Sequence, residues 1–152
     1  MNKIYKYNDN DIPTFDEFCE FITEVNQDFV PPLLDRLDIE QFYSKIKLLA
    51  NIITCRVNNK LVGLCVFYCN DTNTFQSYLT LIAISAQHRG KGIASQLCLR
   101  MEKSAATCGM THLSMHTNNP IALHMYQHLG YSIINKSVIA EGITRYHLTK
   151  HI

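Results

Sequence analysis

The sequence predicts an α/β (α+β) fold, a mixed and mostly antiparallel sheet of about six to seven strands with about four helices. Between residues 52 and 84, three apolar, partly β-branched runs follow one another with turn-forming residues between them, which is typical of an antiparallel meander. After residue 92, two segments with helical spacing of apolar residues alternate with strand-like runs. The expected order of elements is therefore β-α-α-β-β-β-α-β-α-β-β.

The amino-terminal part of the chain is predicted to form a short strand and a capped helix. Ile4, Tyr5 and Tyr7 indicate the strand. Thr14 is the expected N-cap of the helix, because Glu17 three residues later would complete a capping box. The apolar face expected for this helix comprises Phe15, Phe18, Cys19 and Ile22.

A loop and a second helix are expected next. Residues 26–34 contain two adjacent prolines, which interrupt helical hydrogen bonding, so this stretch is expected to be a structured loop. A helix over residues 39–49 should follow, with Asp38 as its cap. The residues expected to face inward from it are Phe42, Ile46 and Leu49.

Turn signals place the remaining elements. Strands at residues 52–57 and 61–68 are joined by Asn58-Asn59-Lys60, whose asparagines favour a tight hairpin turn. A turn cluster at residues 70–74 leads into a third strand at 78–84. The elements expected after the long helix are a strand at 113–117, a helix at 120–129 that begins with Pro120, and closing strands around 131–139 and 144–149.

Length and composition indicate one globular domain over residues 1–152, with a hydrophobic content of 47%. The formal net charge of +1 provides no general basis for nucleic-acid or membrane binding, so we expect neither partner. The amino terminus lacks the apolar segment of a signal peptide, and no apolar run approaches the length of a membrane span. We therefore expect a cytoplasmic protein.

The six cysteines contain no C-x-x-C pair, and they fall mostly inside predicted apolar elements. Reduced core thiols are the expected state. His124 and His128 are spaced four residues apart on a helix, but no third ligand and no zincin-type glutamate accompanies them. The sequence therefore predicts no metal site.

A polar segment with two glycines joins the third central strand to the long helix. Residues 85–92 are polar and basic, and apolar residues then recur at helical spacing up to Gly109, a natural C-terminal cap. Free backbone N–H groups and the helix dipole attract anions at such a helix N-terminus, and Arg89 and Lys91 would add positive charge. Residues 89–94 are therefore predicted to bind a phosphate or pyrophosphate.

Two common phosphate-binding loops are excluded. A Walker loop requires glycine where Ser85 stands. A dinucleotide-binding loop requires a third glycine at the position of Ser95.

Two motifs resemble the GNAT superfamily of acyl-CoA N-acyltransferases. The first, Gln87-x-x-Gly90-x-Gly92, is similar to the pyrophosphate loop Q/R-x-x-G-x-G/A that follows the family's fourth strand. The second matches the later family pattern N-x-x-A-x-x-x-Y-x-x-x-G-F/Y at Asn119, Ala122, Tyr126, Gly130 and Tyr131. The motifs occur in the family's order, and the resemblance is sharp from about residue 78 to residue 131. The expected order of elements agrees with the GNAT fold.

The resemblance implies that the chain binds acetyl-CoA as a co-substrate. The backbone of Ile82, Ala83 and Ile84 is expected to pair with the pantetheine arm, and an N–H near Ile84 to polarise the thioester carbonyl. Tyr126 is expected near the sulfur as a general acid, whereas Asn119 either contacts the cofactor or only begins a helix. The residues expected at the diphosphate are Gln87, Arg89, Gly90, Lys91, Gly92, Ile93 and Ala94.

The chain departs from the family at the general base. Many members carry a glutamate on the fourth strand, but the corresponding residue is Thr80, which cannot act as a base at neutral pH. His116, Tyr78 or a chain of waters could replace it, or the amine could arrive neutral. By resemblance, residues 29–37 help to shape the acceptor pocket. The candidate substrate-binding residues are Phe29, Tyr68, Asp71, Tyr78, Thr80 and His116.

The expected function is transfer of an acetyl group from acetyl-CoA to a primary amine of a small molecule, amino sugar or peptide, directly within a ternary complex. Two alternatives remain open at this point. One is transfer to a hydroxyl or of a longer acyl chain, and the other is a noncatalytic acyl-CoA-binding sensor or interaction module. A homodimer also remains open.

Overall fold

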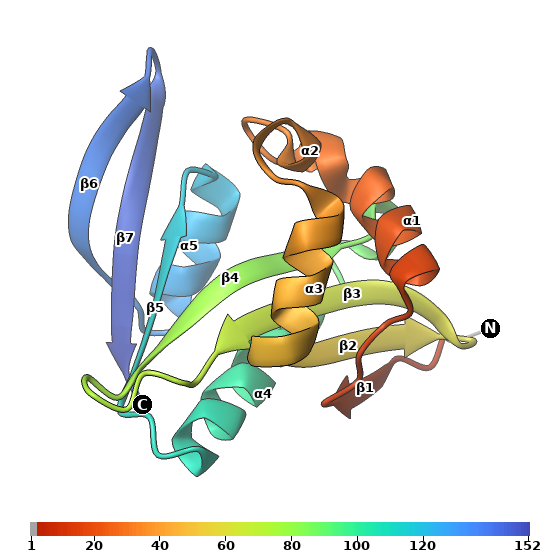
Figure 1. The fold of residues 1–152 in the computed structure, drawn as a ribbon. Helices are drawn as coiled ribbons and strands as arrows, with labels where there is room; N and C mark the ends of the chain where they lie inside the picture. The colour runs from red at the N-terminus through yellow and green to blue at the C-terminus, as the bar shows by residue number, and fades with distance from the viewer. Residues whose placement is uncertain (1–2) are drawn as a thin grey trace.

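Seven strands form one sheet in the order β1-β2-β3-β4-β5-β7-β6 (Figure 1). The structure is a computed structural model that describes residues 3–152. The strands are β1 (Lys6–Asp9), β2 (Asn51–Val57), β3 (Lys60–Tyr68), β4 (Gln76–Ile84), β5 (His112–Thr117), β6 (Ser132–Ala140) and β7 (Ile143–His151). The helices are α1 (Phe15–Val25), α2 (Leu33–Arg36), α3 (Ile39–Leu49), α4 (Ile93–Thr107) and α5 (Pro120–His128), with short 3-10 segments η1 (Asn26–Asp28) and η2 (Ala86–His88).

The sheet is mixed and mostly antiparallel, as predicted, and its one parallel pair among the described strands is β4 with β5. Strands β2, β3 and β4 form the expected meander. The register of β4 with β5 runs from Gln76 opposite His112 to Leu79 opposite Met115, and the pairing then stops. Beyond Leu79, β4 is paired only with β3. The edge of β4 that faces β5 is therefore open over residues 80–84.

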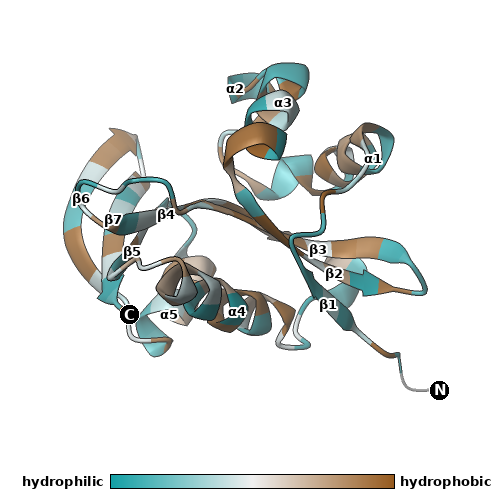
Figure 2. Cartoon of the chain, turned by 60° about the horizontal axis from the view of Figure 1, so that its bottom comes forward, coloured by the Kyte–Doolittle hydropathy of each residue, from teal (hydrophilic) through white to brown (hydrophobic). Residues whose placement is uncertain are grey.

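Helices cover both faces of the sheet, and each face has its own apolar core. Figure 2 shows α1, α2 and α3 on one side of the sheet and α4 and α5 on the other. The first core includes Phe18, Ile22, Ile46, Leu64 and Val66. The second core includes Phe67, Leu97, Met101, Leu113, Met115 and Leu148. The alternation of side chains along β3 supplies both cores, because successive residues point to opposite faces.

Local signals in the sequence form the predicted caps and turns. Thr14 and Glu17 make the reciprocal capping box at the start of α1, and the Asp38 side chain accepts a hydrogen bond from the N–H of Gln41 at the start of α3. Asn58 and Asn59 have φ angles of 49° and 68°, the left-handed conformation that a tight two-residue hairpin requires.

Two expectations for the segment before β2 are corrected. The stretch predicted to be a loop, residues 26–34, contains the 3-10 segment η1 and ends within the one-turn helix α2, which begins after Pro32. Leu49 is 49% exposed, and Tyr43 occupies the inward face of α3 instead. Leu49 is the last residue of its helix, whereas Tyr43 is buried and its hydroxyl donates to the carbonyl of Pro13, just before α1, at 2.6 Å.

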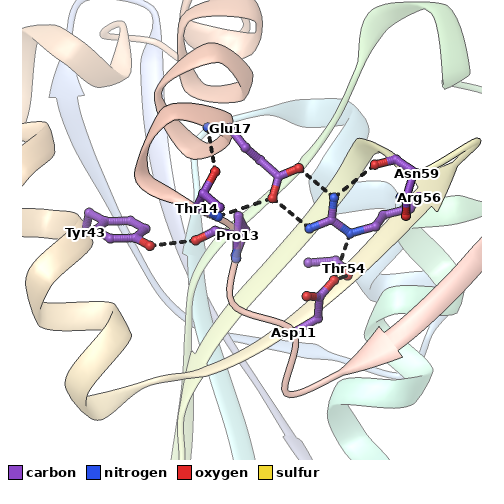
Figure 3. A network of polar contacts seen from close by, with 8 residues as sticks. All are labelled: Asp11, Pro13, Thr14, Glu17, Tyr43, Thr54, Arg56 and Asn59. Atoms are coloured by element: carbon purple, nitrogen blue, oxygen red, sulfur yellow. Dashed lines mark hydrogen bonds and ion pairs between the residues drawn. The ribbon is translucent and has the colours of Figure 1, made fainter.

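An arginine on β2 ties the first helix to the sheet (Figure 3). The Arg56 guanidinium donates to both Glu17 carboxylate oxygens at 2.7 and 2.9 Å, and to Asp11 at 2.9 Å. Thr54 also donates to Asp11. The capping residue Glu17 therefore serves the helix end and the interface at once.

The six cysteines are free thiols, and Cys55, Cys65 and Cys98 are buried in the sheet and α4. Burial raises the pKa of Cys98 to about 12, which keeps that thiol protonated and unreactive. None of the helices within residues 3–152 combines the length and apolar character that crossing a bilayer requires.

Candidate functional site

The glycine loop precedes the N-terminus of α4 as predicted. Gly90 and Gly92 have φ angles of 73° and 78°, and a Cβ at either position would meet nothing within 4 Å. The glycines are therefore needed for their left-handed backbone and not for lack of space. The first intrahelical bond runs from the N–H of Gln96 to the carbonyl of Gly92, and no side chain caps this end. The preceding amides are consequently available to an anion.

A cavity of about 360 Å³ opens at this helix end. Its walls come from β4, the glycine loop, the first turn of α4, and α5. The predicted residues that line it are Ile82, Ile84, Arg89, Gly90, Gly92, Ile93, Ala94, Asn119 and Tyr126. Gln87 and Lys91 are exposed and lie outside its lining.

The open edge of β4 forms one wall of this cavity. The N–H of Ser85 bonds to Val62 in β3, and backbone groups alternate in direction along a strand. Ala83 therefore directs its N–H and C=O toward β3, while Ile82 and Ile84 direct theirs toward the open side. In agreement, the Ile84 carbonyl accepts a hydrogen bond from Arg89 Nε at 3.1 Å. Of the three residues expected to pair with an extended ligand, Ile82 and Ile84 have the required orientation.

The Arg89 side chain is engaged by a carboxylate. Its guanidinium donates to both oxygens of Asp28, at 3.3 Å for one of them, and this ion pair connects the loop to η1. Arg89 was expected to add positive charge to the anion-binding loop. In the structure, Asp28 neutralises much of that charge locally.

A second cavity of about 420 Å³ adjoins the first. Ile82, Arg89, Asn119 and Tyr126 line both cavities, so the two spaces meet over α5. The second cavity lies where β4 and β5 diverge, and its further walls come from η1, α2 and β7. A ligand in one cavity would therefore reach a ligand in the other at Tyr126.

Tyr126 lies at this junction and is 3% exposed. Burial, together with the nearby thiols of Cys98 and Cys65, raises its pKa well above the usual 10. Its ring packs edge-on against Tyr131 with 5.9 Å between centroids. Tyr126 therefore holds its proton at neutral pH.

Asn119 is the N-cap of α5. Its Oδ1 accepts hydrogen bonds from the N–H groups of Ile121 at 2.9 Å and Ala122 at 3.4 Å. The side chain thus starts the helix that carries Tyr126, and it also lines both cavities. The two roles considered for Asn119 are compatible.

The six candidate acceptor residues divide into two groups. Four of them, Phe29, Tyr78, Thr80 and His116, line the second cavity. Tyr68 lies outside it, with Lys45 Nζ 5.7 Å from its ring centroid, and Asp71 accepts hydrogen bonds from the backbone of Asn73 and Thr74 within an exposed turn. The structure brings the first four together and leaves Tyr68 and Asp71 apart.

Tyr78 and His116 form a pair inside the second cavity. The Tyr78 hydroxyl and His116 Nδ1 share a hydrogen bond of 2.7 Å, and the His116 ring stacks on His147 with 4.2 Å between centroids. The pKa of His116 is lowered by burial and by electrostatic interaction with Arg145 and His147. Its imidazole is therefore neutral at pH 7. A neutral imidazole bonded to a phenol can accept a proton.

Sequence reasoning did not single out three charged residues of the second cavity, Asp28, Arg36 and Arg145, although Arg36 falls within residues 29–37, which were expected to help shape the acceptor pocket. They come from η1, α2 and β7 and belong to neither motif. No local pattern distinguishes them from ordinary surface residues. Within residues 3–152, no three side chains of the metal-binding types lie together.

The comparisons identify a family and a fold. A family model described as "Acetyltransferase (GNAT) family" matches residues 16–131. A GNAT acetyltransferase from Streptococcus pneumoniae has a similar structure, with a TM-score of 0.78 at 19% identity over 98% of this chain and 99% of that chain. No curated protein matches the chain.

Two further similar structures contain coenzyme A or its acetyl ester. The PaiA N-acetyltransferase from Thermoplasma acidophilum, in complex with coenzyme A, has a TM-score of 0.75 at 14% identity over 98% of this chain and 99% of that chain. A GNAT acetyltransferase from Elizabethkingia anophelis with acetyl-CoA bound has a TM-score of 0.72 at 16% identity over 97% and 98%. At such identities the likeness shows a shared fold.

Proposed function

The chain belongs to the GNAT family of acetyltransferases, and on that premise we propose that it transfers an acetyl group from acetyl-CoA to a primary amine within a ternary complex. The observation that carries this proposal is the meeting of two cavities at Tyr126. The first cavity suits the acyl donor and the second suits the acceptor. Residues 1–152 would act as one domain, because all described strands join a single sheet.

The donor cavity matches the parts of acetyl-CoA. The free amides at the start of α4 would hold the diphosphate, with Gly90 and Gly92 providing the backbone conformation. The open edge of β4 at Ile82 and Ile84 would pair with the amides of the pantetheine arm. Coenzyme A in the similar Thermoplasma structure supports this use of the fold.

The junction provides groups for each step of the transfer. The N–H of Ile84 would polarise the thioester carbonyl while the amine nitrogen forms its new bond to the carbonyl carbon. As the carbon–sulfur bond breaks, Tyr126 would donate its proton to the departing thiolate. The Tyr78–His116 pair would take the proton that the amine loses. The Tyr78 oxygen would accept the amine's proton while the Tyr78 hydroxyl proton passes to His116 Nδ1.

Ligand-dependent stability and coenzyme A release test this function. Acetyl-CoA at one hundred times its dissociation constant should stabilise the fold by about 2.7 kcal/mol, while NAD and ATP should do much less. Release of coenzyme A should then require a primary amine. Equal stabilisation by all three ligands would exclude a dedicated acyl-CoA site. Acetyl-CoA binding without release for any amine would indicate a sensor instead, an alternative suggested by Thr80 where many members have a glutamate.

A further inference from the structure

Two arginines enter the second cavity without a carboxylate partner. Arg36 comes from α2 and Arg145 from β7, and both line the cavity. In Figure 1, α2 and β7 lie on opposite sides of the place where β4 and β5 diverge. Within residues 3–152, neither arginine forms an ion pair with an aspartate or glutamate. This differs from Arg56, Arg89 and Arg100, which are all paired.

The other charged groups of the cavity do not compensate for these arginines. Asp28, its one lining carboxylate among the described residues, is already engaged by Arg89. His116 is neutral at pH 7, as is the Tyr78 phenol, whose pKa is raised by burial despite the nearby charge of Arg145. The cavity therefore carries a surplus of positive charge, from Arg36 and Arg145.

Arg36 and Arg145 line the same cavity, so the charge of each acts on the other. Burial and then the charge of Arg145 lower the pKa of Arg36. Arg36 also lies over the Phe29 ring, with 5.9 Å from its Cζ atom to the ring centroid, which restricts where the guanidinium can point. Two like charges facing one cavity repel, and an anion between them would remove that cost. Guanidinium groups bind carboxylates and phosphates through paired, charge-assisted hydrogen bonds.

We propose that the acceptor is an amine that also carries an anionic group, a carboxylate or a phosphate ester, and that Arg36 and Arg145 bind this group. The inference rests on the proposed function, because it takes the second cavity as the acceptor site. With the anion at the arginines, the amine end would extend toward Tyr126 at the junction of the cavities. Polyamines and other purely cationic amines would be repelled from this cavity.

Matched ligand pairs test the proposal by equilibrium binding. The protein is saturated with coenzyme A, which cannot transfer an acetyl group, and is titrated calorimetrically with β-alanine against β-alaninamide, and with phosphoethanolamine against ethanolamine. In at least one pair the anionic member should bind about tenfold tighter or more than its neutral partner. The better pair then identifies the carboxylate or the phosphate as the preferred group. Absence of preference in both pairs, or tighter binding of spermidine, would overturn the inference.

Variants that remove a positive charge test whether Arg36 and Arg145 cause the preference for anionic amines. Arg36→Gln and Arg145→Gln should each reduce it by about tenfold, and Arg145→Lys should retain part of it. Arg100→Gln is the matched control, because Arg100 lies on α4 outside both cavities and pairs with Asp9. Melting temperature and acetyl-CoA binding should stay near those of the parent in all four variants. A preference that survives in the double glutamine variant would contradict the assignment.

Parallel measurement of coenzyme A release separates this inference from the proposed function. Release with neutral amines as efficient as with anionic ones would disprove the anionic acceptor and leave the acetyltransferase intact. Selective binding of anionic amines without any release of coenzyme A would support the anion-binding arginines and contradict the proposed acetyl transfer.

Discussion

The Tyr78 hydroxyl and His116 Nδ1 share a 2.7 Å hydrogen bond across the parallel pair of β4 and β5. Both side chains line the second cavity, and Thr80, which stands where many family members have a glutamate, lies on the same wall. The pair therefore lies where the proposed reaction would need a proton acceptor. It does so with two residues from strands that are joined only through the α4 crossover.

The first prediction concerns this pair. Because burial, Arg145 and His147 lower the pKa of His116, activity should persist down to a pH below 6.5 and then fall as the imidazole becomes protonated. His116→Gln should lower kcat/KM by roughly 10²-fold and remove this acidic limb from the pH profile.

Tyr78→Phe is the companion variant, because it keeps the ring and removes only the hydroxyl. If the two residues act as one relay, the double variant should lose little more than either single variant. An acidic limb that persists in both single variants would assign the titration to a different group.

The second prediction concerns the glycine loop. Gly92→Glu should abolish stabilisation by acetyl-CoA, because it places a negative charge and added bulk at the start of α4. The backbone strain of a side chain at φ 78° costs about 1 kcal/mol by itself. Thermal unfolding with and without acetyl-CoA separates the two effects.

Gly109→Glu controls for that strain. Gly109 has φ 87°, also meets nothing within 4 Å, and lies at the opposite end of α4 from both cavities. This variant should be destabilised to a similar extent but should keep the full shift with acetyl-CoA. Loss of the shift in both variants would show that the strain, and not the loop, is responsible.

The elements and the residues around the first cavity could be placed from the sequence because their signals are local. The capping box of Thr14 and Glu17, the two asparagines of the hairpin and the glycines before α4 each act within a few residues. Sequence spacing likewise places Asn119 at the start of α5 and Tyr126 within it. These residues could be recognised from their neighbours in the sequence alone.

The charge pattern of the second cavity could not be predicted in this way. Arg89 is neutralised by Asp28, which is 61 positions away, and Arg36 and Arg145 converge from α2 and β7. Their proximity depends on the divergence of β4 from β5, which is a property of the whole sheet. Leu49 was misassigned for a related reason, since the helical period continues to the end of α3 while the contact with the sheet ends earlier.

The third prediction concerns stability. Arg56→Met should destabilise the fold by about 2 kcal/mol, because it leaves Glu17 and Asp11 without their partner. This is below the usual cost of breaking a fully buried pair, because the Arg56 side chain is 14% exposed and the carboxylates are more exposed still. Arg100→Met, which breaks an exposed pair with Asp9, should cost at most about 1 kcal/mol in the same denaturant titration.

The effect of Arg56→Met should depend on pH. Hydrogen bonds from Arg56 lower the pKa of Glu17, and those from Thr54 and Arg56 lower the pKa of Asp11 despite its burial. Carboxylates with a lowered pKa stabilise the fold above their unfolded pKa of about 4, and this contribution is lost as the pH falls through the folded value. The stability difference between parent and variant should therefore narrow below pH 4. A constant difference across that range would mean that the ion pairs are not its source.

The fourth prediction concerns Tyr126 as the acid for the departing thiolate. Tyr126→Phe preserves the packing of the ring against Tyr131 and removes only the hydroxyl, so stability should change little. Both kcat and kcat/KM should fall together by roughly 10²-fold, with acetyl-CoA affinity retained, because the proton is needed only as the carbon–sulfur bond breaks. Because burial raises the pKa of Tyr126 well above 10, its titration should add no basic limb to the pH profile below about pH 10.

Tyr131→Phe provides the control for this variant. Tyr131 packs beside Tyr126 and donates to Glu102 at 3.1 Å, but it lines neither cavity. Its hydroxyl should therefore contribute to stability and leave kcat near that of the parent. A Tyr126→Phe enzyme with nearly normal kcat would show that the tyrosine is structural. An effect confined to KM would assign its hydroxyl to substrate binding, because an acid that acts only in the transition state must lower kcat and kcat/KM together.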